Sequence, residues 1–269
     1  MIEIGISPIA FTIGGVEVRW YGIFVALAVL TVVLWVLWEV KRGAKLSYDT
    51  VFAAALVGIP SGVIFSRLLH VVDDWSYYSQ NPGQIIGAAG LTAWGAILGA
   101  ALGIWIYSRV KNLHFGYMAD VIAPGIILSQ AVGRVGCTIN GCCYGVPTSL
   151  PWGIVYTSPD SLGPIGVAVH PTTVYEIIWN LMVFGVLFGL RKRLKPDGSL
   201  FLVYLSLYSL WRVGGDFLRD GTPFLFGLHQ AQVIAIVVLL IAIPLLVWRT
   251  RWAKPEALPE PVEPTQPVL

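Results

Sequence analysis

The stretch Met118 to Gly136, MADVIAPGIILSQAVGRVG, is long and apolar enough to cross a bilayer as one helix, yet its last turn carries Arg134. A guanidinium at membrane depth costs about 2.5–3.5 kcal/mol on insertion scales, so we expect it to persist only beside an anionic partner or an aqueous cavity. This stretch therefore predicts a membrane helix with a candidate site at its end.

The rest of the chain repeats this apolar pattern. The 269 residues are 56% hydrophobic and 12% charged, whereas soluble domains are about 25% charged. The mean hydropathy is +0.74. We predict an all-α, polytopic membrane helix bundle of about seven transmembrane helices, because six further apolar runs reach spanning length, near residues 20–38, 51–71, 86–107, 173–190, 200–217 and 232–248.

The distribution of lysine and arginine predicts the orientation of the bundle. Most of the 17 basic residues, including every lysine, fall in connections on one side, which the positive-inside rule places in the cytoplasm. An odd number of helices then puts the N-terminus outside and the C-terminus inside. The basic residues left at the opposite, outer ends are all arginines, namely Arg19, Arg67, Arg134, Arg212 and Arg219.

The segments outside the helices differ in composition. We expect residues 1–19 to form an extracytoplasmic, strand-like arm before a bundle over residues 20–252. The connection 137–171 is long and rich in Gly, Pro, Ser and Thr, which predicts a folded extracytoplasmic cap. Residues 253–269 are dominated by Pro and Glu, so we expect a disordered cytoplasmic tail.

The five outer arginines allow two interpretations. They could be interfacial side chains that reach the headgroup level, with acids such as Asp73, Asp216 and Asp220 as partners. Alternatively, they form a phosphate-binding pocket that opens to the outer leaflet, because bidentate arginine contacts suit a phosphodiester. Three of the five lie inside the apolar segments, which favours the pocket. An anionic lipid, and no nucleic acid, is then the expected ligand.

Four spaced motifs stand out along the chain. They are RWYG from Arg19 to Gly22, the stretch from Ala123 to Gln130 that leads into GRVGCTING from Gly133 to Gly141, HPTTVYE from His170 to Glu176, and RVGGDFLR from Arg212 to Arg219. Together they resemble the signature of the prolipoprotein diacylglyceryl transferase family, in order from about Val18 to Trp248.

The resemblance implies a multi-pass enzyme of the bacterial plasma membrane whose site faces the outer leaflet. Such an enzyme moves the diacylglyceryl group of phosphatidylglycerol to the lipobox cysteine thiol of a preprolipoprotein signal peptide and releases glycerol 1-phosphate. It needs no cofactor and no metal. By this likeness we expect Arg134, Arg212 and Tyr21 to be catalytic, and Arg134, Asn140, Arg212, Glu176, Asp216 and Arg219 to bind the substrate. From their place at the outer end of the second helix, we add His70 as a catalytic residue and Arg67 as a substrate-binding residue.

One departure from the family pattern concerns the base. The histidine that the family usually carries in its third helix is Trp94 here, and an indole cannot accept a proton. Four explanations of the missing histidine remain open. His70 or His170 replaces the base, the thiol ionises without one, or the chain is a divergent paralogue that binds an anionic lipid and is non-catalytic or acts differently. A transporter is disfavoured, because the sequence has no internal repeat.

A second departure concerns cysteine, because Cys137 stands where the family usually has an asparagine and Cys142 where it usually has an acidic residue. All three cysteines of the chain, Cys137, Cys142 and Cys143, lie in one heptapeptide that we expect to face an oxidising compartment. A disulfide bracing the turn after Arg134 and simple packing at a helix end are both compatible with this spacing. A metal site is disfavoured, because it would need a fourth ligand for which only a histidine or a carboxylate is available.

Glycines in the third apolar run predict helix packing. Gly95, Gly99 and Gly103 recur at four-residue spacing, the pattern that lets two membrane helices approach closely.

Overall fold

A computed structural model describes residues 1–86, 92–221 and 223–252. The side chains of Ala93 and Trp94 are outside that description, and so is the expected tail over residues 253–269.

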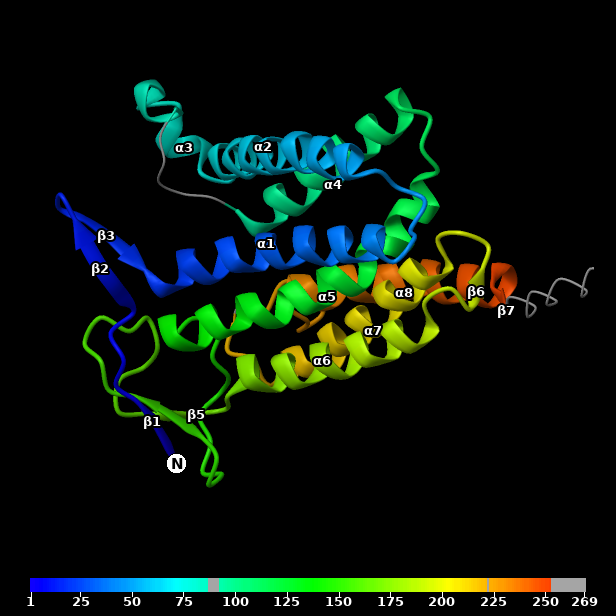
Figure 1. Cartoon of the computed structure of the whole chain (residues 1–269). Coiled ribbons are helices and arrows are strands. Elements are labelled where there is room, and N and C mark those ends of the chain that lie inside the picture. The colour runs from blue at the N-terminus through cyan, green and yellow to red at the C-terminus, as the bar shows by residue number, and fades with distance from the viewer. Residues whose placement is uncertain (87–91, 222, 253–269) are drawn as a thin grey trace, which may run out of the picture.

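Most of the described chain is helical (Figure 1). Five helices are long and apolar enough to cross a membrane, namely α1, α2, α5, α6 and α8, and residues Gly95–Val110 of α4 form a shorter apolar helix. The chain is therefore a multi-pass helical membrane protein, as predicted. The helix bounds are α1 (Trp20–Lys41), α2 (Tyr48–Asp73), α3 (Trp75–Tyr78), η1 (Pro82–Gln84), α4 (Ala93–Val110), α5 (Phe115–Asn140), α6 (Thr172–Leu190), α7 (Ser199–Gly215), η2 (Asp216–Leu218) and α8 (Gln230–Arg249).

Helix α5 is the centre of the bundle. It packs against α1, α6 and α7, while α7 also packs against α8. In its apolar section 39% of the residues are buried, against 17–28% in the other four spanning helices. Ala123 and Ile127 of α5 are fully buried against Val183 and Leu187 of α6 and Tyr204 of α7. The outward apolar side chains of the other helices are exposed, as lipid contact requires.

A carboxylate fixes the start of α7. Asp120 on α5 accepts hydrogen bonds of 2.8 Å from the backbone N–H groups of Gly198 and Phe201. These donors belong to the first turn of α7, where backbone N–H groups lack helical partners. This contact sets the height of α7 against α5, and it therefore helps to align the residues at the far ends of both helices.

Helices α2 and α4 form a separate pair that lies beside α1 (Figure 1). A Cβ atom added to Gly99 of α4 would collide with the Ser61 carbonyl oxygen of α2, and one added to Gly95 would collide with the Phe65 backbone. Gly103 approaches the Ser61 side chain in the same way. The close approach predicted from the glycine spacing is thus confirmed.

This contact can be tested with one methyl group. We expect Gly99→Ala to destabilise the protein by about 1–3 kcal/mol, because the new methyl group meets backbone that cannot move aside. Gly185→Ala on α6 is the matched control, because its Cβ atom has no neighbour within 4 Å. That change should be neutral or stabilising by up to about 1 kcal/mol. Thermal unfolding in detergent measures both, and equal midpoints would contradict the expected difference.

Short strands build a cap at one end of the bundle. β1 (Ile2–Ile4) pairs in parallel with β4 (Ile154–Tyr156), which pairs antiparallel with β5 (Ala168–Val169), while β2 (Ile9–Ile13) and β3 (Val16–Arg19) form a hairpin. At the other end, β6 (Leu194–Lys195) pairs with β7 (Arg251–Trp252). The N-terminal arm and the connection after α5 thus form one folded unit, and the end of the bundle that carries it is called the cap end below.

Candidate active site

A continuous network of five charged side chains lies at the cap end of α5, α6 and α7. Arg134 Nε is 2.9 Å from Glu176 Oε1, and Glu176 Oε2 is 3.8 Å from Arg212 Nη1. Arg212 Nη2 is 3.0 Å from Asp216 Oδ2, and Asp216 Oδ1 is 3.8 Å from Arg219 Nη1. Guanidinium and carboxylate groups therefore alternate across three helices.

The network is buried and carries excess positive charge. The side chains of Glu176 and Asp216 are only 5% and 4% exposed, and that of Arg212 is 13% exposed. Three guanidiniums face two carboxylates, so the formal charge is +1. Within the described residues, Arg212 Nη1 has no hydrogen-bond partner. A buried donor on a net cationic cluster is suited to an additional anion.

Helix periodicity explains why these residues meet. Arg212, Asp216 and Arg219 recur at spacings of four and three residues, which places them on one face of α7 and its 3₁₀ continuation η2. A hydrogen bond of 2.8 Å from Thr138 Oγ1 to Thr173 Oγ1 joins α5 to α6 one turn from this face. This bond holds the ends of α5 and α6 in register.

The end of α5 is shaped by glycine. Gly141 has φ of 72° and caps the helix in the left-handed conformation, and a Cβ atom there would collide with Ser161 and Gly163. Asn140, the last helical residue, is buried, and its Oδ1 accepts a hydrogen bond of 3.5 Å from Arg19 Nη1. The cap thus closes directly over the α5 terminus and brings a fourth arginine beside it.

The loop after Gly141 is fastened to α6 and η2. The Cys143 carbonyl accepts a 2.7 Å hydrogen bond from Thr172 Oγ1, and the Val146 N–H donates to the Leu218 carbonyl at 3.0 Å. Cys143 has φ of 63°, a left-handed conformation that costs a non-glycine residue roughly 1–2 kcal/mol. Strained backbone of this kind is concentrated at functional sites.

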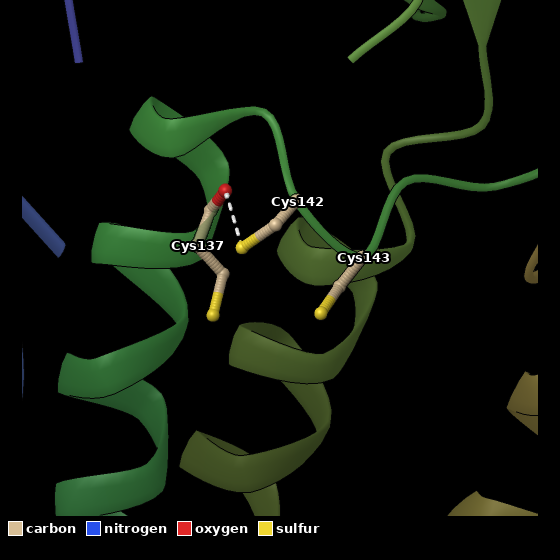
Figure 2. Close-up of side chains that lie close together, drawn as sticks. All are labelled: Cys137, Cys142 and Cys143. Atoms are coloured by element: carbon tan, nitrogen blue, oxygen red, sulfur yellow. Dashed lines mark hydrogen bonds between the residues drawn. The ribbon is translucent and has the colours of Figure 1, made fainter. Parts of the chain in front are cut away.

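The three cysteines converge beside the network. Their sulfur atoms lie within 4.8 Å of one another, and all three thiols are free. Figure 2 shows the sulfurs gathered between the last turns of α5 and the start of α6. Arg134 Nη1 is 3.7 Å from Cys137 Sγ. Hydrogen bonds from the Cys137 and Cys142 thiols lower the pKa of Cys143, and the positive charges of Arg219 and Arg134 act in the same direction.

A small cleft with a volume of about 10 Å³, room for about one water molecule, borders both groups of side chains. Glu176, Asp216 and Arg219 belong to the network, whereas four of the lining residues did not emerge as site residues from the sequence. Those four are Cys143, Thr172, Trp211 and Gly215. The sequence signal for Cys143 was the cysteine heptapeptide, and that for the other three was their position inside or next to the family-like motifs.

The structure places the remaining expected site residues at different distances from this cleft. Tyr21 lies in the first turn of α1, against α5, because a Cβ atom on Gly136 would lie 3.2 Å from the Tyr21 Cα atom. Arg67 instead binds the carbonyl oxygens of Gln84 and Ile85 and lies over the Tyr78 ring. Of the five arginines expected in one group, three belong to the charge network. Arg19 lies beside it through its hydrogen bond to Asn140.

The histidines contact other partners. His70 lies 3.8 Å from the Asp74 carboxylate and edge-on to the Tyr78 ring, on the α2–α3 side of the molecule. His170 lies in the cap, 3.4 Å from the Tyr175 hydroxyl. In the part of the chain that the structure describes, neither ring contacts the charge network, so a role for His70 as the base stays a prediction.

Comparison with known proteins identifies the family. The sequence profile of prolipoprotein diacylglyceryl transferase matches residues 8–248. The chain belongs to the prolipoprotein diacylglyceryl transferase family. A phosphatidylglycerol-prolipoprotein diacylglyceryl transferase of Dehalococcoides mccartyi is 51% identical over 254 residues, which cover 94% of this chain and 98% of the relative. Those of Clostridioides difficile and Acaryochloris marina are 39% and 35% identical, covering 85% and 90% of this chain and 90% of each relative.

The matched region contains every member of the charge network. The network thus lies within the part of the chain that prolipoprotein diacylglyceryl transferases share. The resemblance inferred from four motifs is confirmed over nearly the whole chain.

Proposed function

We propose that this protein transfers the diacylglyceryl group of phosphatidylglycerol to the lipobox cysteine of prolipoproteins. The relatives carry the name of this activity, and the network of Arg134, Glu176, Arg212, Asp216 and Arg219 supports it. Its single excess positive charge matches the single negative charge of a phosphodiester. This match of charge is the observation that carries the proposal. The matching charge is buried at one end of apolar helices.

The reaction requires charge to grow on the phosphate. The lipobox thiolate attacks the carbon of the diacylglyceryl group that is bonded to the phosphate oxygen. That carbon–oxygen bond breaks, and its electron pair leaves with glycerol 1-phosphate. The proton of the thiol ends on the released phosphate. Guanidiniums fixed by carboxylates are already oriented, so they stabilise the developing charge without reorganisation. Glu176 and Asp216 act as positioning residues in this scheme.

We place the cap end on the extracytoplasmic side of the bacterial plasma membrane. Every lysine lies in the connections assigned to the other side, as the positive-inside rule requires of cytoplasmic loops. With α4 and α7 as the two further spans, the seven helices put the N-terminus outside and the network at the outer leaflet. Phosphatidylglycerol then enters from that leaflet and the signal peptide from the same face. Tyr21, Asn140 and Arg67 remain proposed substrate contacts.

Transfer by the purified protein is the direct test. Phosphatidylglycerol labelled in its acyl chains should yield a labelled peptide when mixed with a lipobox peptide, together with one glycerol phosphate for each thioether formed. A peptide with serine in place of the lipobox cysteine should give no product, because a hydroxyl is not ionised near neutral pH. Phosphatidylglycerol that binds without any transfer would contradict the proposal.

That last outcome would instead support a lipid-binding paralogue. Trp94 is the observation that favours this second function, because it occupies the position where the family usually has a histidine. We expect Trp94→Ala to retain transfer, since an indole supplies no base. If the transferase proposal holds, the activity of this variant should stay within a few-fold of the parent.

A further inference from the structure

The three cysteines form a second chemical feature beside the charge network. Their sulfurs lie within 4.8 Å of one another, while three sulfurs bound to one zinc ion with bonds of about 2.3 Å lie about 3.8 Å apart. An inward shift of about an ångström therefore brings them to ligand geometry. Cys142 and Cys143 come from a loop and Cys137 from the last turn of α5 (Figure 2).

The surroundings place positive charge beside these sulfurs. Arg134 Nη1 approaches Cys137 Sγ to 3.7 Å, and the Arg219 guanidinium belongs to the same cleft as Cys143. Three thiolates with one divalent cation carry a net charge of −1, and the guanidiniums of Arg134 and Arg219 lie beside them. Trithiolate sites select soft cations such as zinc.

The cysteine cluster borders this cleft at Cys143. Cys143 lines the cleft together with Glu176, Asp216 and Arg219 of the charge network. Zinc with three protein ligands keeps a fourth position for water or substrate, and a thiol bound there is deprotonated. The sequence places no histidine at the family's usual position for a base, where Trp94 stands.

We propose that Cys137, Cys142 and Cys143 bind one zinc ion whose fourth ligand is the lipobox cysteine thiolate. This inference rests on the proposed function. The lipobox thiol loses its proton on binding, and the metal-bound sulfur then forms the bond to the glyceryl carbon. The carbon–oxygen bond breaks, its electrons go to the phosphate oxygen, and the proton ends on glycerol 1-phosphate. No oxidant or reductant is needed.

Cobalt provides a visible probe for this site. The full-length protein in detergent, reduced and freed of reductant, is titrated with Co²⁺. We expect one ion per chain with a sulfur-to-cobalt charge-transfer band, displaced by Zn²⁺. Because the chain has only three cysteines, the band reports this cluster alone. Each of Cys137→Ser, Cys142→Ser and Cys143→Ser should weaken binding by about tenfold or more, whereas His114→Ala at the opposite end should not change it.

Substrate peptides then separate the two parts of the inference. A lipobox cysteine peptide should shift the cobalt band, and its serine counterpart should leave the band unchanged. Absence of the band, its persistence in all three serine variants, or an unchanged band with the cysteine peptide would overturn the inference. A disulfide in protein isolated without reductant would also overturn it, in favour of a braced loop. Transfer that continues at full rate after zinc removal overturns the metal role while leaving the proposed function intact.

Discussion

Arg212→Ala should lower the rate of diacylglyceryl transfer by about 10²–10³-fold, the usual loss when a fixed donor to a developing negative charge is removed. Arg212 joins the two carboxylates of the network, being 3.8 Å from Glu176 and 3.0 Å from Asp216. Its Nη1 atom has no hydrogen-bond partner within the described residues. Initial rates with labelled phosphatidylglycerol measure the effect.

Two further variants make this prediction specific. Arg212→Lys keeps the charge but loses the planar fork, so it should also lower the rate strongly. Arg109→Ala, which removes a guanidinium stacked on Trp105 near the other end of the bundle, should leave the rate unchanged. A lysine variant as active as the parent would show that charge alone suffices at this position. An alanine variant with unchanged activity would contradict phosphate binding by Arg212.

Glu176→Ala should cause the largest loss in the free energy of unfolding, about 3–5 kcal/mol, because it leaves two buried guanidiniums without their shared partner. The Glu176 side chain is 5% exposed and contacts both Arg134 and Arg212. Unfolding in detergent, followed by circular dichroism against temperature, measures the loss. Because the carboxylate also orients the arginines, transfer should fall in parallel.

The matched control is the exposed acid Glu17. Its carboxylate also pairs with an arginine, Arg19 at 3.8 Å, but it is 53% exposed. Glu17→Ala should therefore cost less than about 1 kcal/mol. Equal losses for Glu17→Ala and Glu176→Ala would mean that burial does not set the energy of these pairs, and the account of the network would fail.

The helices were predictable because apolar length is a direct physical requirement of the bilayer. The glycine contacts of α4 were predictable for a related reason, since four-residue spacing fixes one helix face. Strand pairing of Ile2–Ile4 with Ile154–Tyr156 was not predictable in detail. It joins segments about 150 residues apart, and neither segment carries a local signal for its partner.

The site was predictable from the sequence to the extent that its residues lie at the ends of predicted helices. Arg134, Glu176, Arg212, Asp216 and Arg219 were all expected as site residues, and the structure brings them into one network. Arg67 and His70 were expected beside them, but α2 pairs with α4 away from α5. Residues at the same depth on different helices are neighbours only when those helices pack together. The sequence indicates the depth of a residue in the membrane, but it does not indicate which helices are neighbours.

The central claim is that Arg134 and Arg212 hold one lipid phosphate. Solid-state NMR of the protein with ¹⁵N-labelled arginine in phosphatidylglycerol bilayers measures it through ³¹P–¹⁵N dipolar couplings. The account predicts that guanidinium nitrogens of both residues lie within about 4 Å of the same lipid phosphorus, and that each coupling disappears in the matching Arg134→Ala or Arg212→Ala variant. Couplings unchanged in both variants, or none above background in the parent protein, would contradict it.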